Sequence, residues 1–190
     1  MIYTLDILLL DYKPTNSRKI KINANSTFAQ LCDIIVLLYG LESEHLWEFR
    51  RDTDLFINSP DFGDSMEDLG GFDEVDFGET TWLAVNYNGS KYKLREYFEK
   101  YKEIILYYDF GDNWVFEIKL SKISEEDIKW WELIDGKWYY LLSGVGGVEW
   151  LAELMQEYKK KIVNPDLFES WEDFEDFIKP ALTKFDPNNI

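Results

Sequence analysis

The chain has 190 residues, 46% of them hydrophobic and 17% aromatic, which is enough for one domain with a sizeable core and argues against disorder. Its formal net charge of −17 and pI near 4.4 exclude nucleic-acid binding through a general basic face, because phosphate neutralisation needs clustered Lys and Arg. No apolar run reaches the roughly 18 residues that span a bilayer, so we expect no membrane helix.

The compartment is predicted from the start of the chain and from its cysteine content. The first residues lack a basic segment and carry an early acid, so we expect no signal peptide. The only cysteine, Cys32, cannot form an internal disulfide. Together these features predict a cytoplasmic protein.

The first 50 residues predict strands and one helix. Alternation of apolar and polar residues predicts strands at 2–10, 18–22 and 45–50. A helix is predicted at about 27–39, because its apolar residues recur with helical spacing. We expect Ser26 or Asn25 to cap the start of this helix and Gly40 to end it.

A long acidic stretch follows, with no Lys or Arg from Asp52 to Ser90. Four glycines interrupt it, so we predict a loop at about 52–80 inserted within the domain. The simplest interpretation is a solvated loop that keeps the protein soluble. The alternative is an acidic surface that imitates a phosphate backbone or docks on a basic partner. The candidate acids for such a surface are Asp61, Asp64, Glu67, Asp68, Asp73, Glu74, Asp76 and Glu79.

The remainder predicts further strands and helices. Strands are predicted at 81–87, 104–110, 114–120 and 137–142, and helices at 93–101, from Ser124, at 148–160, and from Ser170 to a stop at Pro180. Strands and helices mix without βαβ regularity. We therefore predict an α+β fold, a single domain over residues 1–190, with a mixed and mostly antiparallel sheet and packed helices.

The segment Tyr107–Ile118 is predicted as a hairpin with a short turn. Gly111 and Asn113 are expected to supply positive φ angles in that turn. Two acids flank the turn, Asp109 and Asp112. We expect Asp112 to cap the turn through its own backbone, and the alternative is a carboxylate site for Mg²⁺ or Ca²⁺.

Catalytic groups are scarce. His45 is the only histidine, and there is no CxxC or HExxH motif, so we predict no metal, no cofactor and no enzymatic activity. Cys32 falls on the apolar face of a predicted helix, where a thiol usually packs. A triad around His45 would have to be assembled in space, and no nucleophile-elbow pattern supports one.

Two further motifs have a structural and a functional interpretation. Residues 144–147, before a predicted helix, invite comparison with a phosphate-binding loop. No Lys follows at the required spacing and Glu149 would repel a phosphate, so a tight strand-to-helix turn is favoured. Four tryptophans are candidates for an exposed aromatic patch, although burial is the default expectation: Trp130, Trp131, Trp138 and Trp150.

Several segments resemble, in matching order, the plasmid pRiA open-reading-frame-three-like family, also described as transposon-passenger TnpR-like proteins. The first is the amino-terminal strand pair and helix, with Arg18 on the second strand. Residues 45–49 are similar to the family's HL-x-x-F strand, and residues 108–114 to its YDFGDxW signature. The glycine pair at 146–147 and the ending at 185–190 are similar to its PPEDxGG turn and its FDPxxFD tail.

The chain departs from the family pattern at two places. Phe116 stands where the family usually has a histidine, and residues 142–145 replace the Pro-Pro-Glu-Asp before the glycine pair. The resemblance implies a compact α+β protein of mobile elements with no established activity. A resolvase function is not expected, because a resolvase needs a basic DNA-binding surface.

We therefore predict a non-enzymatic binding or accessory protein of mobile-element origin, with a protein partner and no direct contact to nucleic acid or membrane. The alternative is an acidic nucleic-acid mimic that inhibits a host defence protein. The candidate binding groove is His45, Glu48, Asp109, Asp112, Trp114, Gly146 and Gly147, because the family signature concentrates there.

Overall fold

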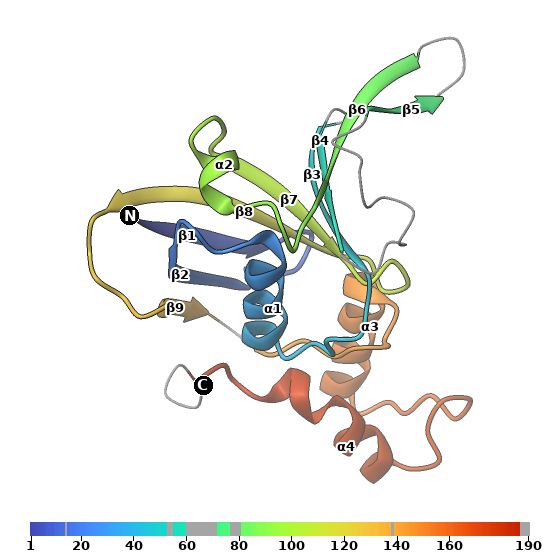
Figure 1. Cartoon of the computed structure of the whole chain (residues 1–190). Coiled ribbons are helices and arrows are strands. Elements are labelled where there is room, and N and C mark those ends of the chain that lie inside the picture. The colour runs from blue at the N-terminus through green and yellow to red at the C-terminus, as the bar shows by residue number, and fades with distance from the viewer. Residues whose placement is uncertain (14, 53–54, 60–71, 77–80, 138, 187–190) are drawn as a thin grey trace.

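The computed structural model describes residues 1–13, 15–52, 55–59, 72–76, 81–137 and 139–186 (Figure 1). Its strands are β1 Ile2–Leu9, β2 Ser17–Asn23, β3 Trp47–Arg51, β4 Leu55–Asn58, β5 Phe72–Asp76, β6 Thr81–Asn88, β7 Glu103–Tyr108, β8 Trp114–Ser124 and β9 Trp131–Lys137. Its helices are α1 Phe28–Tyr39, α2 Leu94–Phe98, α3 Gly147–Lys160 and α4 Trp171–Leu182.

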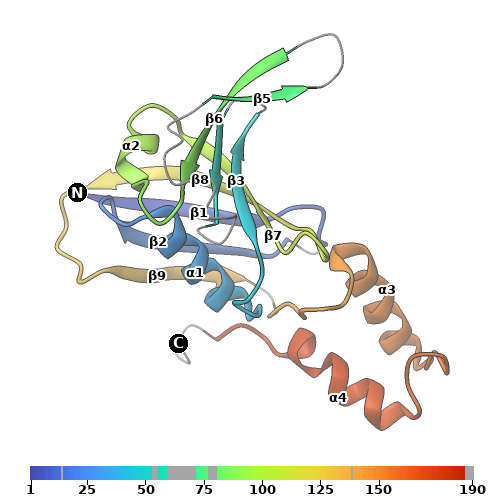
Figure 2. The ribbon, with the colours of Figure 1, turned by 45° about the vertical axis from the view of Figure 1, so that its right-hand side comes forward.

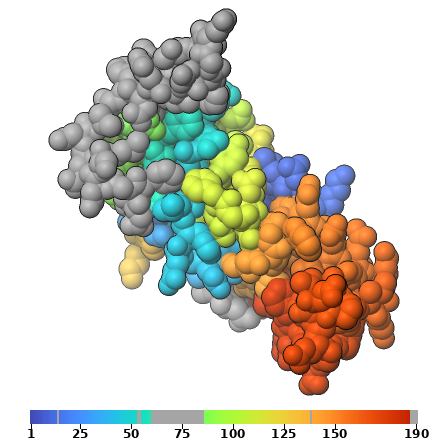
Figure 3. Space-filling model, turned by 90° about the vertical axis from the view of Figure 1, so that its right-hand side faces the viewer, coloured from blue at the N-terminus to red at the C-terminus, as the bar shows by residue number. Residues whose placement is uncertain are grey.

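The strands form one sheet with the order β5-β6-β4-β3-β7-β8-β1-β2-β9. Neighbouring strands pair antiparallel, except that β4 and β6 run parallel. Helices α1 and α2 pack against this sheet, whereas α3 and α4 extend beyond its end, and the chain has no repeating βαβ units in its described part (Figures 2 and 3). The predicted α+β class with a mixed, mostly antiparallel sheet is confirmed.

Helix α1 is the central helix of the core. Thr27 is its N-cap: the Thr27 hydroxyl accepts from the Gln30 amide, and the Gln30 side chain accepts in return from the Thr27 amide. The prediction of Ser26 or Asn25 as the cap was therefore one or two residues too early. Gly40 ends the helix at φ 72°, as predicted.

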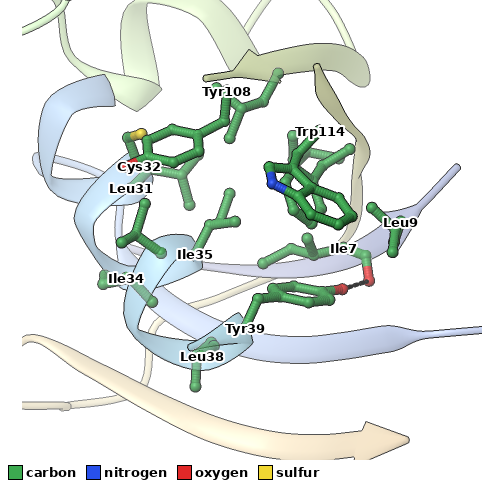
Figure 4. Packing of buried hydrophobic residues seen from close by; sticks show 14 of the residues in the cluster. Ile7, Leu9, Leu31, Cys32, Ile34, Ile35, Leu38, Tyr39, Tyr108 and Trp114 are labelled. Carbon is green, nitrogen blue, oxygen red and sulfur yellow. Dashed lines mark hydrogen bonds between the residues drawn. The ribbon is translucent and has the colours of Figure 1, made fainter. Parts of the chain in front are cut away.

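The core lies between α1 and the middle of the sheet. Ile35 and Tyr39 of α1 face Ile7 and Trp114 of β1 and β8 (Figure 4), and all four are fully buried. The Tyr39 hydroxyl donates to the Ile7 carbonyl at 3.2 Å. This packing fixes where β8 begins, and with it the position of the β7–β8 turn.

Three predicted elements were wrong. The stretch predicted as a loop contains β4 and β5, because Leu55 and Ile57 alternate into the core within an acidic composition that concealed them. No helix begins at Ser124 in the described part of the chain, because β8 extends to this residue. The strand predicted at 137–142 lies earlier, as β9, a half-exposed strand at the edge of the sheet.

Helices α3 and α4 form a pair that projects from the end of the sheet at which β7 turns into β8 (Figures 1 and 2). α4 begins at Ser170, whose hydroxyl accepts from the Asp173 amide at 3.1 Å. It ends at Leu182, two residues beyond the predicted stop at Pro180. None of the described helices is long and apolar enough to cross a membrane.

Candidate partner-binding site

The β7–β8 turn is held by Asp109. This residue has a φ of 54°, and its Oδ1 accepts from the amides of Gly111 and Asp112 at 3.0 and 3.4 Å. Asn113 has the predicted positive φ, at 53°, whereas Gly111 does not, and Asp109 takes the second left-handed position. Asp109, rather than Asp112, thus makes the local turn contact.

Asp112 reaches away from its own turn to the start of α3. Its Oδ2 accepts from the amides of Gly144 and Val145 at 2.8 and 3.3 Å, and its Oδ1 accepts from the Gly146 amide at 2.8 Å. A carboxylate of this chain thus occupies the amides that a phosphate would need. The favoured prediction of a tight turn at 144–147 is supported over a phosphate-binding loop.

Gly147 lets the two segments come this close. A Cβ on Gly147 would lie 2.0 Å from the Asp112 carbonyl oxygen, and its φ of 81° is in the left-handed region. Gly146, at φ 85°, lies under the Trp150 indole, whose Cδ1 would be 2.8 Å from a Cβ. Packing against the Asp112 backbone therefore requires Gly147, and the positive φ favours glycine at position 146.

His45 lies beside the same turn. Its Nε2 is 3.6 Å from Asp109 Oδ2 and 3.8 Å from Glu42 Oε2, and its ring meets the Tyr108 ring edge-on with centroids 6.1 Å apart. The Tyr108 hydroxyl donates to the Glu42 carbonyl. His45 is partly exposed, whereas Asp109 beside it is buried, so the His45 ring is open to a partner on one side of the turn.

The remaining two predicted groove residues, Glu48 and Trp114, are buried. Trp114 is fully buried in the core, and its Nε1 has no acceptor among the described residues. Glu48 is buried in β3 and pairs with Arg50. The structure therefore brings His45, Asp109, Asp112, Gly146 and Gly147 to one turn. Trp114 directly follows this turn and pairs with Tyr108, but its side chain is buried in the core, and Glu48 is buried in β3.

An open apolar groove of about 420 Å³ lies next to this turn, between α3 and α4. Its lining is Gly144, Val145, Gly146, Trp150, Leu154, Leu167, Phe168 and Phe177. We call this surface the α3–α4 groove. Among the described residues, only Gly146 of the predicted groove and only Trp150 of the predicted aromatic patch belong to it.

Large apolar side chains stay exposed in the α3–α4 groove. Trp150 and Leu167 are each 53% exposed, and Phe177 is 40% exposed. Contiguous exposed apolar side chains commonly mark an interaction surface. The sequence signal for this groove was weak, because Leu167 lies between helices and Phe177 fits the periodicity of a buried face.

Aromatic packing beneath the groove keeps it formed. The Phe168 ring lies 4.8 Å from that of Phe174, which is fully buried, and 5.2 Å from that of Phe177. Tyr158 of α3 stacks on Trp171 of α4 at 5.3 Å. These contacts hold α3 and α4 at a fixed separation.

Cys32, the only cysteine of the sequence, is buried in α1. Burial raises the pKa of the Cys32 thiol well above its ordinary value, so Cys32 is not a ready nucleophile. Within the described ranges, no three His, Cys, Asp or Glu side chains are grouped so as to hold a metal ion.

Of the eight acids proposed for an acidic surface, three lie in β5: Asp73, Glu74 and Asp76. The other five, Asp61, Asp64, Glu67, Asp68 and Glu79, lie outside the described residues, as does Trp138. The prediction that these acids share one face stays a prediction.

The family model of the plasmid pRiA4b ORF-3-like protein matches residues 1–190. The chain belongs to this family. No curated protein matches the chain in sequence. It is similar to the crystal structure of MM3350, a protein of unknown function from Methanosarcina mazei Go1, with 25% identity and a TM-score of 0.73 over 100% of this chain and 96% of that chain.

At both places where this chain departs from the family pattern, the structure shows a buried apolar side chain. Phe116, at the position where a histidine is usual, is fully buried, and its ring lies 4.7 Å from that of Tyr39. Val145, which replaces an acid of the Pro-Pro-Glu-Asp segment, is buried and donates its amide to Asp112. Apolar packing therefore occupies both positions.

Proposed function

We propose that this protein is a non-enzymatic binding protein of mobile-element origin that holds a segment of a partner protein in the α3–α4 groove. The observation that carries the proposal is the exposure of Trp150, Leu167 and Phe177 around one open, apolar groove. Leaving such side chains in water forgoes the favourable burial that each would gain on contact. A bound partner would supply that burial.

The neighbouring turn supports this proposal by making one wall of the groove rigid. Asp112 fixes the amides of Gly144 and Gly146, both of which line the groove. A preformed wall lowers the entropy lost on binding. The family signature in the β7–β8 turn thereby acts on the groove through Asp112, and His45 lies beside the same turn, 3.6 Å from Asp109.

The test is affinity capture from a lysate of the native host, with the captured proteins identified by mass spectrometry. Trp150→Ala and Phe177→Ala are expected to lose a partner that the unaltered protein captures. The matched control is Ile123→Ala, an equally exposed apolar residue (48%) near the far end of β8. Capture that survives both groove substitutions would contradict the proposal.

A second candidate is inhibition of a host nucleic-acid enzyme by phosphate mimicry. It is favoured by the net charge of −17 and by the absence of Lys and Arg from Asp52 to Ser90. Binding of such a partner would be weakened by salt, and it would depend on the acids of residues 61–79 and not on Trp150. Neutralising those acids in the same capture experiment separates the two candidates.

A further inference from the structure

The α3–α4 groove lies in a strongly acidic part of the chain. Residues 144–182 carry nine carboxylates and four lysines, a net charge of −5. The acids are Glu149, Glu153, Glu157, Asp166, Glu169, Glu172, Asp173, Glu175 and Asp176, and all but the half-buried Glu157 are exposed.

Several of these acids lie beside the exposed apolar side chains. Glu153 follows Trp150 by three residues on α3, and Asp173 precedes Phe177 by four on α4, so each acid neighbours its apolar partner on the helix surface. Asp166 and Glu169 flank the lining pair at 167–168 in the chain. The rim of the groove therefore combines apolar anchors with negative charge.

The lysines lie away from the apolar anchors Trp150 and Phe177. Lys179 is two residues from Phe177, which places it on another face of α4. Lys159–Lys161 follow at the end of α3, and Lys160 is about 15 Å along the helix axis from Trp150 at 1.5 Å per residue. They do little to neutralise the carboxylates at the opposite end of α3.

The lining itself offers few polar groups. It consists of apolar and glycine residues, and the amides of Gly144, Val145 and Gly146 are already bound by Asp112. Sites for small polar molecules usually contain a few convergent polar groups. An apolar floor with a charged rim instead fits the contact face of an amphipathic segment.

From this complementarity we propose that the α3–α4 groove binds a basic amphipathic helix of a partner protein. Apolar side chains at helical spacing of the partner meet Trp150, Leu167 and Phe177, and its Lys or Arg side chains meet the carboxylates of the rim. This inference rests on the proposed function and names the class of partner. A second copy of the chain is disfavoured as the occupant, because two chains of charge −17 repel each other.

The test uses three fluorescent synthetic helices of about 18 residues, which is long enough for helix formation. The first has leucines at i, i+3, i+4 and i+7 with lysines on its polar face. The second replaces the lysines by glutamates, and the third replaces the leucines by serines. Binding to the full chain is measured by fluorescence anisotropy at about 0.1 M and about 1 M salt, between which the Debye length falls from about 10 Å to about 3 Å.

We expect the basic amphipathic helix to bind at least tenfold more tightly than either of the other two, and several-fold more weakly at the higher salt. Trp150→Ala and Phe177→Ala should each weaken it at least tenfold, and the pair Glu153→Gln with Glu169→Gln about fivefold. Ile123→Ala should leave it unchanged. Circular dichroism and urea unfolding establish that each variant is folded.

Equal binding of the acidic and basic helices would overturn the inference but leave the groove as a binding surface. Failure of every helix would also overturn the inference, as would binding that survives both groove substitutions. Binding of an apolar dye without binding of any helix would indicate that the groove takes a small molecule. Dimerisation that is lost in Trp150→Ala would indicate that the groove binds a second copy of the chain. If host capture also proved independent of Trp150, the proposed function would fall with it.

Discussion

Arg18 is a fully buried cation, and its hydrogen bonds to the described residues all go to neutral oxygens. Its Nε donates to the Leu38 carbonyl at 3.1 Å, and its Nη1 to Asn16 Oδ1 and the Lys137 carbonyl, both at 2.8 Å. Its guanidinium lies 3.8 Å from the centroid of the Phe185 ring. Burial lowers the pKa of Arg18 to about 10, so it remains charged at neutral pH.

Arg18 therefore joins β2, α1 and the C-terminal segment. Arg18→Leu should lower the free energy of unfolding by about 3 kcal/mol, because the carbonyls of Leu38 and Lys137 lose their donor in a buried site. Arg18→Lys should recover only part of this loss, since an ammonium lacks the planar fork of donors. Urea unfolding measures both, and a loss below about 1 kcal/mol for Arg18→Leu would contradict this role.

The glycines before α3 offer a second prediction with a matched control. Gly144 and Gly147 have similar φ angles, 73° and 81°, but a Cβ has open space at Gly144 and would meet the Asp112 oxygen at 2.0 Å at Gly147. Gly144→Ala should cost about 1 kcal/mol for its left-handed backbone. Gly147→Ala should cost about 3 kcal/mol or more, since the backbone must also shift. Equal losses in urea unfolding would refute the close packing at Gly147.

At the scale of elements, Asp112 connects the β7–β8 turn to α3. Asp112→Asn should lower stability by about 2 kcal/mol and weaken binding in the α3–α4 groove, because an Asn amide group must face one of the three amide donors. Asp109→Asn is the control: Asn retains an acceptor for the Gly111 amide and tolerates positive φ, so a loss below about 1 kcal/mol is expected. Thermal unfolding and peptide binding are measured for both variants. A larger loss for Asp109→Asn than for Asp112→Asn would contradict the role of Asp112 in connecting the turn to α3.

The sequence predicted most elements whose pattern is local. α1 was evident because its helical apolar period and Gly40 agree, although its cap was predicted one or two residues too early. β4 and β5 were missed because they lie within acidic residues, and β9 was placed too late in the chain because it is half-exposed at an edge of the sheet. The α3–α4 groove could not be predicted, since it depends on how two helices pack after a loop. The reach of Asp112 across more than 30 residues likewise has no local signature.

At the scale of the whole molecule, buried tyrosines predict a limit to alkaline stability. Burial raises the pKa of Tyr92 and Tyr108 to about 12, and it also raises the pKa of Tyr3, Tyr12, Tyr39 and Tyr97. The folded state then binds more protons than the unfolded state between pH 10 and 12, so stability is intact below pH 10 and lost as pH rises through this window. The lowered pKa of Arg18 makes stability rise with pH in the same window, but this is the effect of one group against six tyrosines.

The measurement is the free energy of unfolding from urea titrations at a series of pH values, followed together with the ultraviolet absorbance of tyrosinate. We expect stability to fall above pH 10 and tyrosinate to appear cooperatively with unfolding. Tyrosines that titrate gradually near pH 10 in the folded protein, without loss of stability, would show that they are not buried as described.

The central claim is that the α3–α4 groove is the binding surface of the molecule. An unbiased selection of peptides tests it most directly. A random peptide library displayed on phage is selected on the unaltered protein, and the enriched peptides are then measured on Trp150→Ala, Phe177→Ala and Ile123→Ala. We predict enriched peptides with apolar residues at helical spacing among Lys and Arg, bound equally by Ile123→Ala and at least tenfold more weakly by the two groove variants. Enriched peptides that bind all three variants equally, or no enrichment at all, would contradict the account.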